Sequence, residues 1–334
     1  MRAIILGNFD GVHLGHQALL KAAGIAVHSA QDCVRDALSV HVWTFNPPPR
    51  SVLSPDFKVE RLQRVEDRVR QLHLMGATGV EVIRPTVELL GRSAADFITQ
   101  LHGDRGFDFI VEGPDFRFGK GREGSMDLLR TLGGKLGFKV IEVPAVSVQL
   151  SNGTTVQARS GAIRQLLHQG NVGDAGRILG RPFSMRAQVV RGEQRGRTIG
   201  WPTANLDAEE FAQHQLLIPA DGVYAGFGRL SQAIGEVEAA SAVIAAISVG
   251  TKPTFGGTET TVEATLLAPD GRPLEIELDT YGWTLELEFR EWIRPQVRFP
   301  SLEALLAQME LDRARIVELA THFIEVNPTA MSAE

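Results

Sequence analysis

The chain has 334 residues, 43% of them hydrophobic and 22% charged, a composition typical of a globular protein with two domains. Its net charge of −6 argues against a broad nucleic-acid-binding surface, and its single cysteine, Cys33, excludes an internal disulfide. No apolar run of about 18 residues could cross a bilayer, and the first residues lack the charged lead of a signal peptide, so we expect a cytoplasmic protein with small-molecule partners.

The chain opens with a strand, a glycine-rich loop and a helix. The apolar run Ala3–Leu6 predicts a buried strand, and residues 17–26 predict a helix. Between them lies GNFDGVHLGH, whose glycines let the backbone approach a ligand, beside a helix N-terminus that attracts anions. We therefore predict a phosphate site in this loop. Its candidate residues are Gly7, Asn8, Phe9, Asp10, Gly11, His13, Gly15 and His16.

The two histidines of this loop are the candidates for chemistry. His13 and His16 lie three residues apart at a helix start, where both can donate hydrogen bonds to a phosphate in a charged transition state. A zinc site is the weaker alternative, because the pair supplies only two ligands and no obvious third partner is present. A plain glycine-rich turn is the other alternative, but Asn8 and Asp10 beside the histidines favour a site.

The first half continues as alternating strands and helices. Helical patterns such as Leu62–Met75 separate the apolar strand candidates, which are Val40–Phe45, Val80–Ile83, Phe107–Val111 and Val140–Val143. This alternation predicts a parallel, doubly wound, Rossmann-like sheet, with ligands bound beyond the carboxyl ends of its strands. The loop TFNPPPR, which includes Asn46, follows the second strand and joins the predicted site. Residues 171–179 predict one more helix, and we place the domain boundary at residue 180.

A second glycine-rich segment, VEGPDFRFGKGREG at residues 111–124, superficially resembles a phosphate-binding P-loop. A P-loop has four residues between its glycines and Ser or Thr after its lysine. Here five residues separate Gly113 from Gly119, and Gly121 follows Lys120, which excludes that motif. An aromatic loop at the end of a strand can instead enclose a planar ring, with simple loop packing as the alternative.

In the second half the apolar period changes to two. Alternating apolar residues predict half-buried strands at Met185, Ala187 and Val189, at Leu274, Ile276 and Leu278, and at Leu285, Leu287 and Phe289. Turns such as residues 269–272 separate them, which favours a closed antiparallel barrel. A final helix begins at Ser301. We interpret its apolar stripe as core packing; it comprises Leu302, Leu305, Leu306, Met309, Ile316, Leu319 and Phe323.

The segment RGRTIGWPTANL, residues 195–206, joins a basic loop to a strand. Thr203 and Asn205 alternate on that strand and offer two neutral oxygen ligands on one side, as Mg²⁺ accepts. Arg197, between Gly196 and Gly200, lies in a flexible loop able to cover ATP phosphates, unless it serves only solubility.

Glu263 stands out in a later strand. It lies between Val262 and Ala264, where a carboxylate requires a reason. The alternative is a solvent-facing position.

The motifs of the first half resemble those of bacterial bifunctional riboflavin kinase/FAD synthetases. His13 to His16 match the family's HxGH motif, Asp115 to Gly119 match DFxFG, and TFNPPPR is similar to TFxPHP with Pro48 in place of histidine. The resemblance implies transfer of an adenylyl group from ATP to FMN, with the histidines stabilising the charge that develops. It also implies that Asp115, Phe116 and Phe118 surround the flavin and the nucleotide.

The second half resembles riboflavin kinase. The matching segments in order are RGRTIGWPTANL, GVYA at 222–225, VGTKPTF at 249–255, VEATLL at 262–267 and DTYG at 279–282. Thr265 stands where the family commonly has histidine. The resemblance implies Mg²⁺-dependent phosphoryl transfer from ATP to riboflavin, with Thr203 and Asn205 at the metal and Glu263 as general base.

One segment departs from the family. The SSTxIR motif is replaced by RSGAIR at residues 159–164, where Ser160 and Arg164 remain but Arg159 and Gly161 replace two hydroxyl donors. Losing one preorganised donor costs roughly 3 kcal/mol, about a hundredfold in rate, although the charge of Arg159 can compensate. Two alternatives therefore stay open: a kinase with a degenerate first domain, and a non-catalytic flavin or nucleotide sensor. A different adenylyltransferase substrate is disfavoured by the attached kinase barrel, and the oligomeric state is not predicted.

Overall fold

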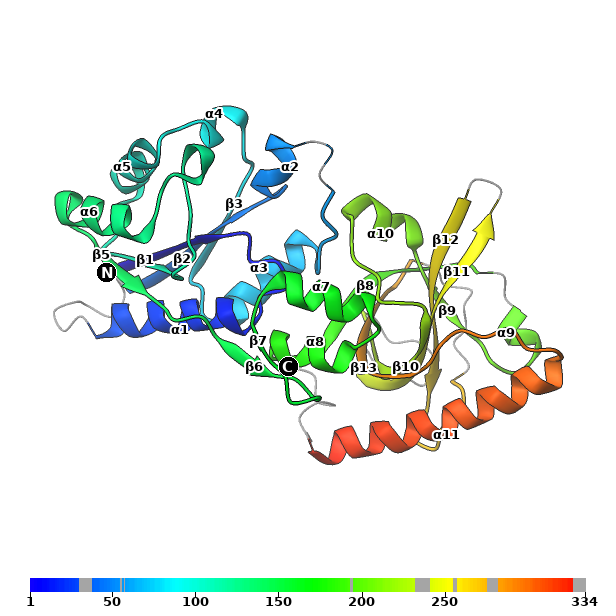
Figure 1. Ribbon diagram of the computed structural model, residues 1–334. Coiled ribbons are helices and arrows are strands. Elements are labelled where there is room, and N and C mark those ends of the chain that lie inside the picture. Colours follow the sequence, from blue (N-terminus) through cyan, green and yellow to red (C-terminus); the bar gives the residue numbers. More distant parts are fainter. Residues whose placement is uncertain are drawn as a thin grey trace. The chain divides into compact units, whose positions relative to one another are not determined.

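The computed structural model describes residues 1–29, 38–54, 56, 58–192, 195–231, 241–254, 257–274 and 282–326. Contacts divide the chain into two compact units, Met1–Ser160 and Gly161–Glu334 (Figure 1). Residues 161–180 thus group with the second unit, ahead of the boundary expected at residue 180. The reason is that α8 (Val172–Leu179) packs against two barrel strands, β8 (Phe183–Val190) and β13 (Thr284–Arg294).

The first unit is built on a five-stranded parallel sheet in the order β3-β2-β1-β4-β5. Its strands are β1 (Arg2–Gly7), β2 (Ser39–Phe45), β3 (Gly79–Ile83), β4 (Phe109–Glu112) and β5 (Lys139–Glu142). The predicted doubly wound sheet is confirmed. Strand order reverses between β1 and β4, and a ligand crevice is expected at that point.

Helices cover both faces of this sheet, and its central strands β1 and β4 are buried on both sides. On one face α1 (Leu14–His28) and α3 (Val65–Leu74) bury Leu20 and Leu72 against β1 and β2. On the other face, which α5 (Ala94–Arg105) and α6 (Met126–Leu136) cover in Figure 1, Ile98 and Leu129 are buried. Ser93 and Ser125 cap these two helices by accepting hydrogen bonds from backbone N–H groups. The remaining elements are α2 (Pro49–Leu53), α4 (Val87–Leu90), η2 (Lys120–Arg122), β6 (Ser147–Gln149) and β7 (Thr155–Gln157).

The second unit is a closed antiparallel barrel in the order β10-β11-β12-β9-β8-β13, as predicted. Its further strands are β9 (Ala204–Leu206), β10 (Gly222–Leu230), β11 (Ala242–Thr254) and β12 (Gly257–Leu267). The residues with period two at 185–189 and 285–289 fall on β8 and β13 and point into the core. Of the strand expected at 274–278, Leu274 is buried, and Ile276 and Leu278 lie outside the described residues. The helices are α7 (Ser160–His168), α8, α9 (Arg195–Thr198), α10 (Ala208–His214) and α11 (Leu302–Val326).

Helix α11 begins after Ser301, as predicted, and closes one side of the barrel core. Ile316 is buried against Phe227 and Leu267, whereas Leu302 at the helix start is 50% exposed. The predicted apolar stripe therefore packs mainly through its second half. A largely buried ion pair between Arg294 and Asp312, at 2.7 Å, fixes the helix to β13. Within the described part of the chain, no helix is long and apolar enough to span a membrane.

Candidate active sites

The loop after β1 adopts an uncommon backbone conformation. Phe9 and Val12 have positive φ values of 48° and 42°, which non-glycine residues rarely adopt, and Gly11 has 85°. Both side chains are buried, at 1% and 0% exposure, so core packing holds the strained backbone in place. The loop is thus fixed in shape by the fold.

The two histidines stack at the start of α1. The rings of His13 and His16 lie 3.6 Å apart, centroid to centroid, at 19°, and His16 also packs against Phe9. Gly15 permits this arrangement, because a Cβ there would lie 3.1 Å from the carbonyl oxygen of Ala158 and 3.2 Å from the ring of His13. The structure thus brings the two predicted histidines into direct contact.

His16 is buried and neutral. Burial, together with the neighbouring His13 and Arg68, lowers the pKa of His16 well below its ordinary value of 6.5. Its Nδ1 has no hydrogen-bond partner among the described residues. A neutral imidazole at this place can offer a ligand one hydrogen-bond donor and one acceptor.

A cavity of about 300 Å³ adjoins the histidines. The carboxyl ends of β1 and β4 contribute to its walls, together with the chain that follows β5 and the segment that leads into α7. Its polar lining includes His13, His16, Glu112, Asp115, Arg159 and Ser160. This size lies at the lower end of the range for small-molecule sites.

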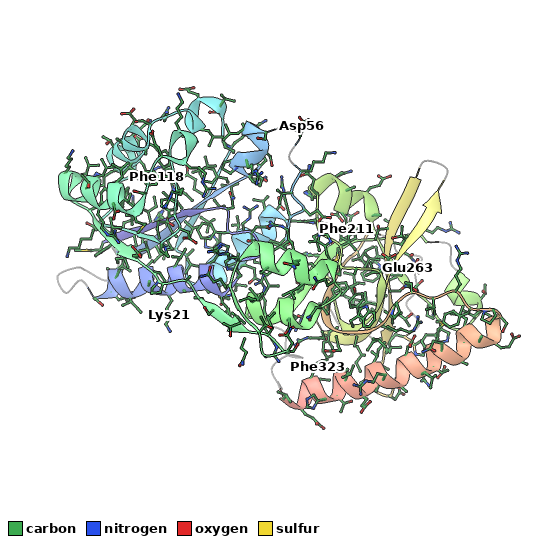
Figure 2. The ribbon with its side chains drawn as sticks, in the orientation of Figure 1. Lys21, Asp56, Phe118, Phe211, Glu263 and Phe323 are labelled. Atoms are coloured by element: carbon green, nitrogen blue, oxygen red, sulfur yellow. The ribbon has the colours of Figure 1, made fainter. Side chains whose placement is uncertain are left out.

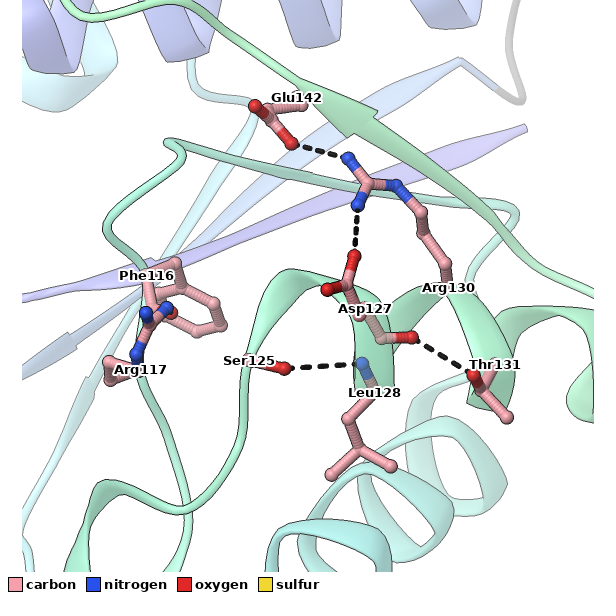
Figure 3. A network of polar contacts seen from close by, with 8 residues as sticks. All are labelled: Phe116, Arg117, Ser125, Asp127, Leu128, Arg130, Thr131 and Glu142. Carbon is pink, nitrogen blue, oxygen red and sulfur yellow. Dashed lines mark hydrogen bonds and ion pairs between the residues drawn. The ribbon is translucent and has the colours of Figure 1, made fainter.

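A second cavity, of about 640 Å³, is lined by the DFRFG loop, residues 115–119. Phe116 and Phe118 line it with nearly parallel rings, whose centroids are 5.3 Å apart. Asp115 and Phe116 border both cavities, as do Leu6 and Gly7, so the two spaces adjoin. Figure 3 shows Phe116 and Arg117 with the polar network at the start of α6.

That network fixes the start of α6. Ser125 accepts a hydrogen bond from the N–H of Leu128, and Arg130 contacts both Asp127 and Glu142. Because Glu142 ends β5, the network ties α6 to the sheet.

Several predicted ligand residues use their polar groups within the protein. The carboxylate of Asp10 accepts a hydrogen bond from the N–H of Leu62 at 3.0 Å, and the Oγ of Ser160 donates to the carbonyl of Asp10 at 2.8 Å. Asn46 accepts from Arg61 at 2.8 Å. In this structure these side chains hold the loops around the cavities.

Arg68 supports the same loops and was not predicted. It projects from α3, is 2% exposed, and donates to the carbonyls of Asn8 and Phe45 at 2.6 and 3.0 Å and to the Oγ1 of Thr44 at 2.9 Å. Burial lowers the pKa of Arg68, and Asp10 opposes that change. One side chain therefore joins the loops after β1 and β2. A helical arginine gives no sequence signal of such a role.

Glu112 was also missed. The pairing of β1 with β4 ends at Ile4 and Ile110, and farther along the carboxylate of Glu112 accepts a hydrogen bond from the N–H of Leu6 at 2.7 Å. Glu112 is 2% exposed, and burial raises its pKa well above the ordinary value of 4.5. The group sits where the strands part, at the crevice expected from the strand order.

In the barrel, strand register brings the predicted kinase residues together. Glu263 on β12 lies directly opposite Asn205 on β9, and Thr203 immediately precedes that strand (Figure 2 labels Glu263). Ala204 and Leu206 point into the core, so Thr203 and Asn205 share the other face. On its other side Glu263 lies opposite Ser248, which accepts a hydrogen bond from Gln296 at 2.8 Å. Ser248 and Gln296 were not predicted.

The glycines of the basic loop and the candidate Arg164 lie in or beside short helices. Gly196 lies in α9, where a Cβ would come within 2.1 Å of the carbonyl oxygen of Trp201, and Gly200 follows that helix. The side chain of Arg197 lies outside the described part of the structure. Arg164 lies on α7. Among the described residues, no cluster of three or more His, Cys, Asp or Glu side chains is suited to a metal ion.

Family models match both parts of the chain. The FAD synthetase model matches residues 1–156, and the riboflavin kinase model matches residues 179–320. The bifunctional riboflavin kinase/FMN adenylyltransferase of Escherichia coli K12 is 33% identical over 310 residues, which cover 92% of this chain and 90% of that protein. The chain belongs to this bifunctional family.

Other family members and a solved structure agree over nearly the whole length. The bifunctional enzyme of Listeria monocytogenes serovar 1/2a is 32% identical and covers 93% of this chain and 90% of that protein. A crystal structure from Streptococcus pneumoniae, described as a macrolide-efflux protein, is 30% identical with a TM-score of 0.78, covering 94% of this chain and 92% of that one. The bifunctional family fold thus extends through both units.

Proposed function

We propose that residues 181–330 phosphorylate riboflavin to FMN and that residues 1–180 transfer an adenylyl group from a second ATP to FMN, forming FAD. The proposal rests above all on the two polar groupings: Asn205 opposite Glu263 in the barrel, and the stacked histidines that line the smaller of two adjoining cavities. The family membership given above supports both activities.

In the kinase reaction, Glu263 takes the proton from the 5′-hydroxyl of riboflavin as that hydroxyl oxygen attacks the terminal phosphorus of ATP. The bond between this phosphorus and the bridging oxygen of the β-phosphate breaks, and ADP leaves. The side-chain oxygens of Thr203 and Asn205 fit a hard cation, and they would hold Mg²⁺ together with phosphate oxygens. Bound Mg²⁺ would neutralise the phosphate charge. The loop that carries Gly196, Arg197 and Gly200 closes over the phosphates in this proposal.

In the adenylyl transfer, a phosphate oxygen of FMN forms a bond to the α-phosphorus of ATP, and the bond to the β-phosphate breaks as pyrophosphate leaves. His13 and His16 donate hydrogen bonds to the oxygens that gain charge. We assign the nucleotide to the smaller cavity and the flavin ring to the larger one, where Phe116 and Phe118 offer aromatic surface.

We further propose that the protein acts in the cytoplasm on small molecules and not on nucleic acid, in line with its net charge of −6. A kinase with a degenerate first domain remains the second candidate, because Gly161 lacks a hydroxyl and Ser160 donates to Asp10. A flavin sensor without turnover is the third.

Two variants test whether the two reactions take place in different parts of the chain. Glu263→Gln is expected to abolish FMN formation from riboflavin while FAD formation from FMN continues. His16→Ala is expected to stop FAD formation and leave FMN formation intact. Chromatographic separation of the flavins measures both. If either variant loses both products while remaining folded, the two reactions are wrongly assigned to the two units.

A further inference from the structure

An ion pair stands at the edge of the smaller cavity. The guanidinium of Arg159 contacts the carboxylate of Asp115 at 2.6 Å, and both residues line the cavity that contains the histidines. The two side chains are 59% and 77% exposed. This pair joins the RSGAIR segment to the DFRFG loop.

The cavity needs positive charge if it is to hold a polyphosphate. Among the described residues that line it, Arg159 is the only arginine or lysine. His16 is neutral because burial lowers its pKa, and the hydroxyl of Ser160 is directed to the carbonyl of Asp10. Within this lining, Arg159 is therefore the residue that supplies positive charge for phosphate binding.

The present partner of Arg159 is easily exchanged. An exposed ion pair contributes only about 0 to 1 kcal/mol, since water screens it and holding the side chains costs entropy. A polyphosphate carries several negative charges, and its paired oxygens match the planar fork of a guanidinium. ATP can therefore displace Asp115 from Arg159 at small cost.

We propose that Arg159 is the principal phosphate-binding residue of the nucleotide cavity, held by Asp115 in the free protein and transferred to the polyphosphate of ATP on binding. The inference rests on the proposed adenylyl transfer in the first unit. It assigns to the arginine the binding role that the two absent hydroxyl groups of RSGAIR would have shared.

The kinetic test uses the full-length protein and starts from FMN, so that kinase turnover does not contribute. Arg159→Gln is expected to raise the KM for ATP at least about tenfold, as for loss of a charged hydrogen bond. The inhibition constant of pyrophosphate should rise in parallel, and the KM for FMN should stay constant. Arg159→Lys keeps the charge but loses the planar fork of donors. Its KM for ATP should lie between those of the wild type and Arg159→Gln.

A binding test does not depend on turnover. Calorimetric titration with inorganic tripolyphosphate is expected to show one binding site. Its dissociation constant should be at least about tenfold higher in Arg159→Gln than in the wild type. Asp115→Asn, which releases the guanidinium, should bind tripolyphosphate equally well or up to about fivefold more tightly. The rate of FMN formation from riboflavin, unchanged in these variants, serves as the internal control.

The outcomes separate this inference from the proposed function. Wild-type protein that makes no FAD from FMN would contradict the proposed adenylyl transfer, while the titration still tests Arg159. Equal tripolyphosphate affinity in wild type and Arg159→Gln would overturn the role of Arg159. Weaker binding in Asp115→Asn would overturn the exchange of partners.

Discussion

The two units build their sites from different kinds of structure. In the first, the polar groups stand on loops beyond the ends of parallel strands, held by the buried side chains of Phe9 and Val12 and by the buried Arg68. In the barrel, the register of neighbouring strands places Asn205 opposite Glu263. The loop-built site therefore depends on buried side-chain contacts, whereas the strand-built site depends on the backbone pairing of β9 with β12 and on the segment that leads into β9.

The largest effect is expected in the segment that leads from α9 to Thr203 in the barrel. In Gly196→Ala the new Cβ would lie 2.1 Å from the carbonyl oxygen of Trp201, so the chain leading to Thr203 must move. A displacement of about 1 Å can cost about a hundredfold in rate. FMN formation from riboflavin should fall by at least that factor, measured by chromatography, and FAD formation from FMN should not change.

Gly173→Ala on α8 provides the control, because its Cβ would lie 3.7 Å from the carbonyl oxygen of Arg290, an ordinary contact distance. Normal kinase activity in Gly196→Ala would show that the site does not depend on this segment.

Arg68 tests the dependence of the loop-built site on buried tertiary contacts. Arg68→Met leaves the carbonyls of Asn8 and Phe45 without this buried donor, which should lower the free energy of unfolding of the first unit by about 3 kcal/mol. Differential scanning calorimetry measures this, and the barrel should unfold as in the wild type. Arg70→Met on the same helix, with an exposed pair to Asp67 at 3.1 Å, should cost less than about 1 kcal/mol. Equal losses in the two variants would contradict the role given to Arg68.

A smaller effect is expected at the histidine pair. In Gly15→Ala the new Cβ would lie 3.2 Å from the ring of His13, so the ring must shift by a few tenths of an ångström. FAD formation from FMN should fall about tenfold, and kinase activity should be retained. In Gly24→Ala on the same helix, no described residue beyond the neighbouring turns of that helix lies within 4 Å of the new Cβ, so this variant should be as active as wild type. An active Gly15→Ala would mean that the stacking is not needed.

The smallest effect concerns pH. Because burial raises the pKa of Glu112 well above 4.5, the folded protein keeps a proton that the unfolded chain releases as pH rises above that value. Stability of the first unit should thus decline with rising pH in this window. Glu112→Gln stays neutral, and it should be more stable than wild type at pH 8, by no more than about 2 kcal/mol, and about equal at pH 4.5. Thermal unfolding curves that shift in parallel would contradict this.

Periodicity and turn chemistry were sufficient to predict the sheet, the barrel and the final helix. The alternation at Met185 and Ala187 predicts a half-buried strand, and both side chains are buried on β8. The supporting residues could not be predicted. Arg68 belongs to a polar helix face by pattern, and Ser248 and Gln296 come close to Glu263 only through strand register and the chain after β13. Such roles arise from contacts between distant segments, which a single sequence does not reveal.

The central claim is that each unit carries out its own reaction, and one measurement tests it most directly. Purified protein is incubated with ATP and excess Mg²⁺ in two parallel time courses, one started from riboflavin and one from FMN, and the flavins are separated by chromatography. We expect FMN followed by FAD in the course started from riboflavin, and FAD directly in the course started from FMN. FMN that accumulates without FAD from either start, or no conversion at all, would contradict it.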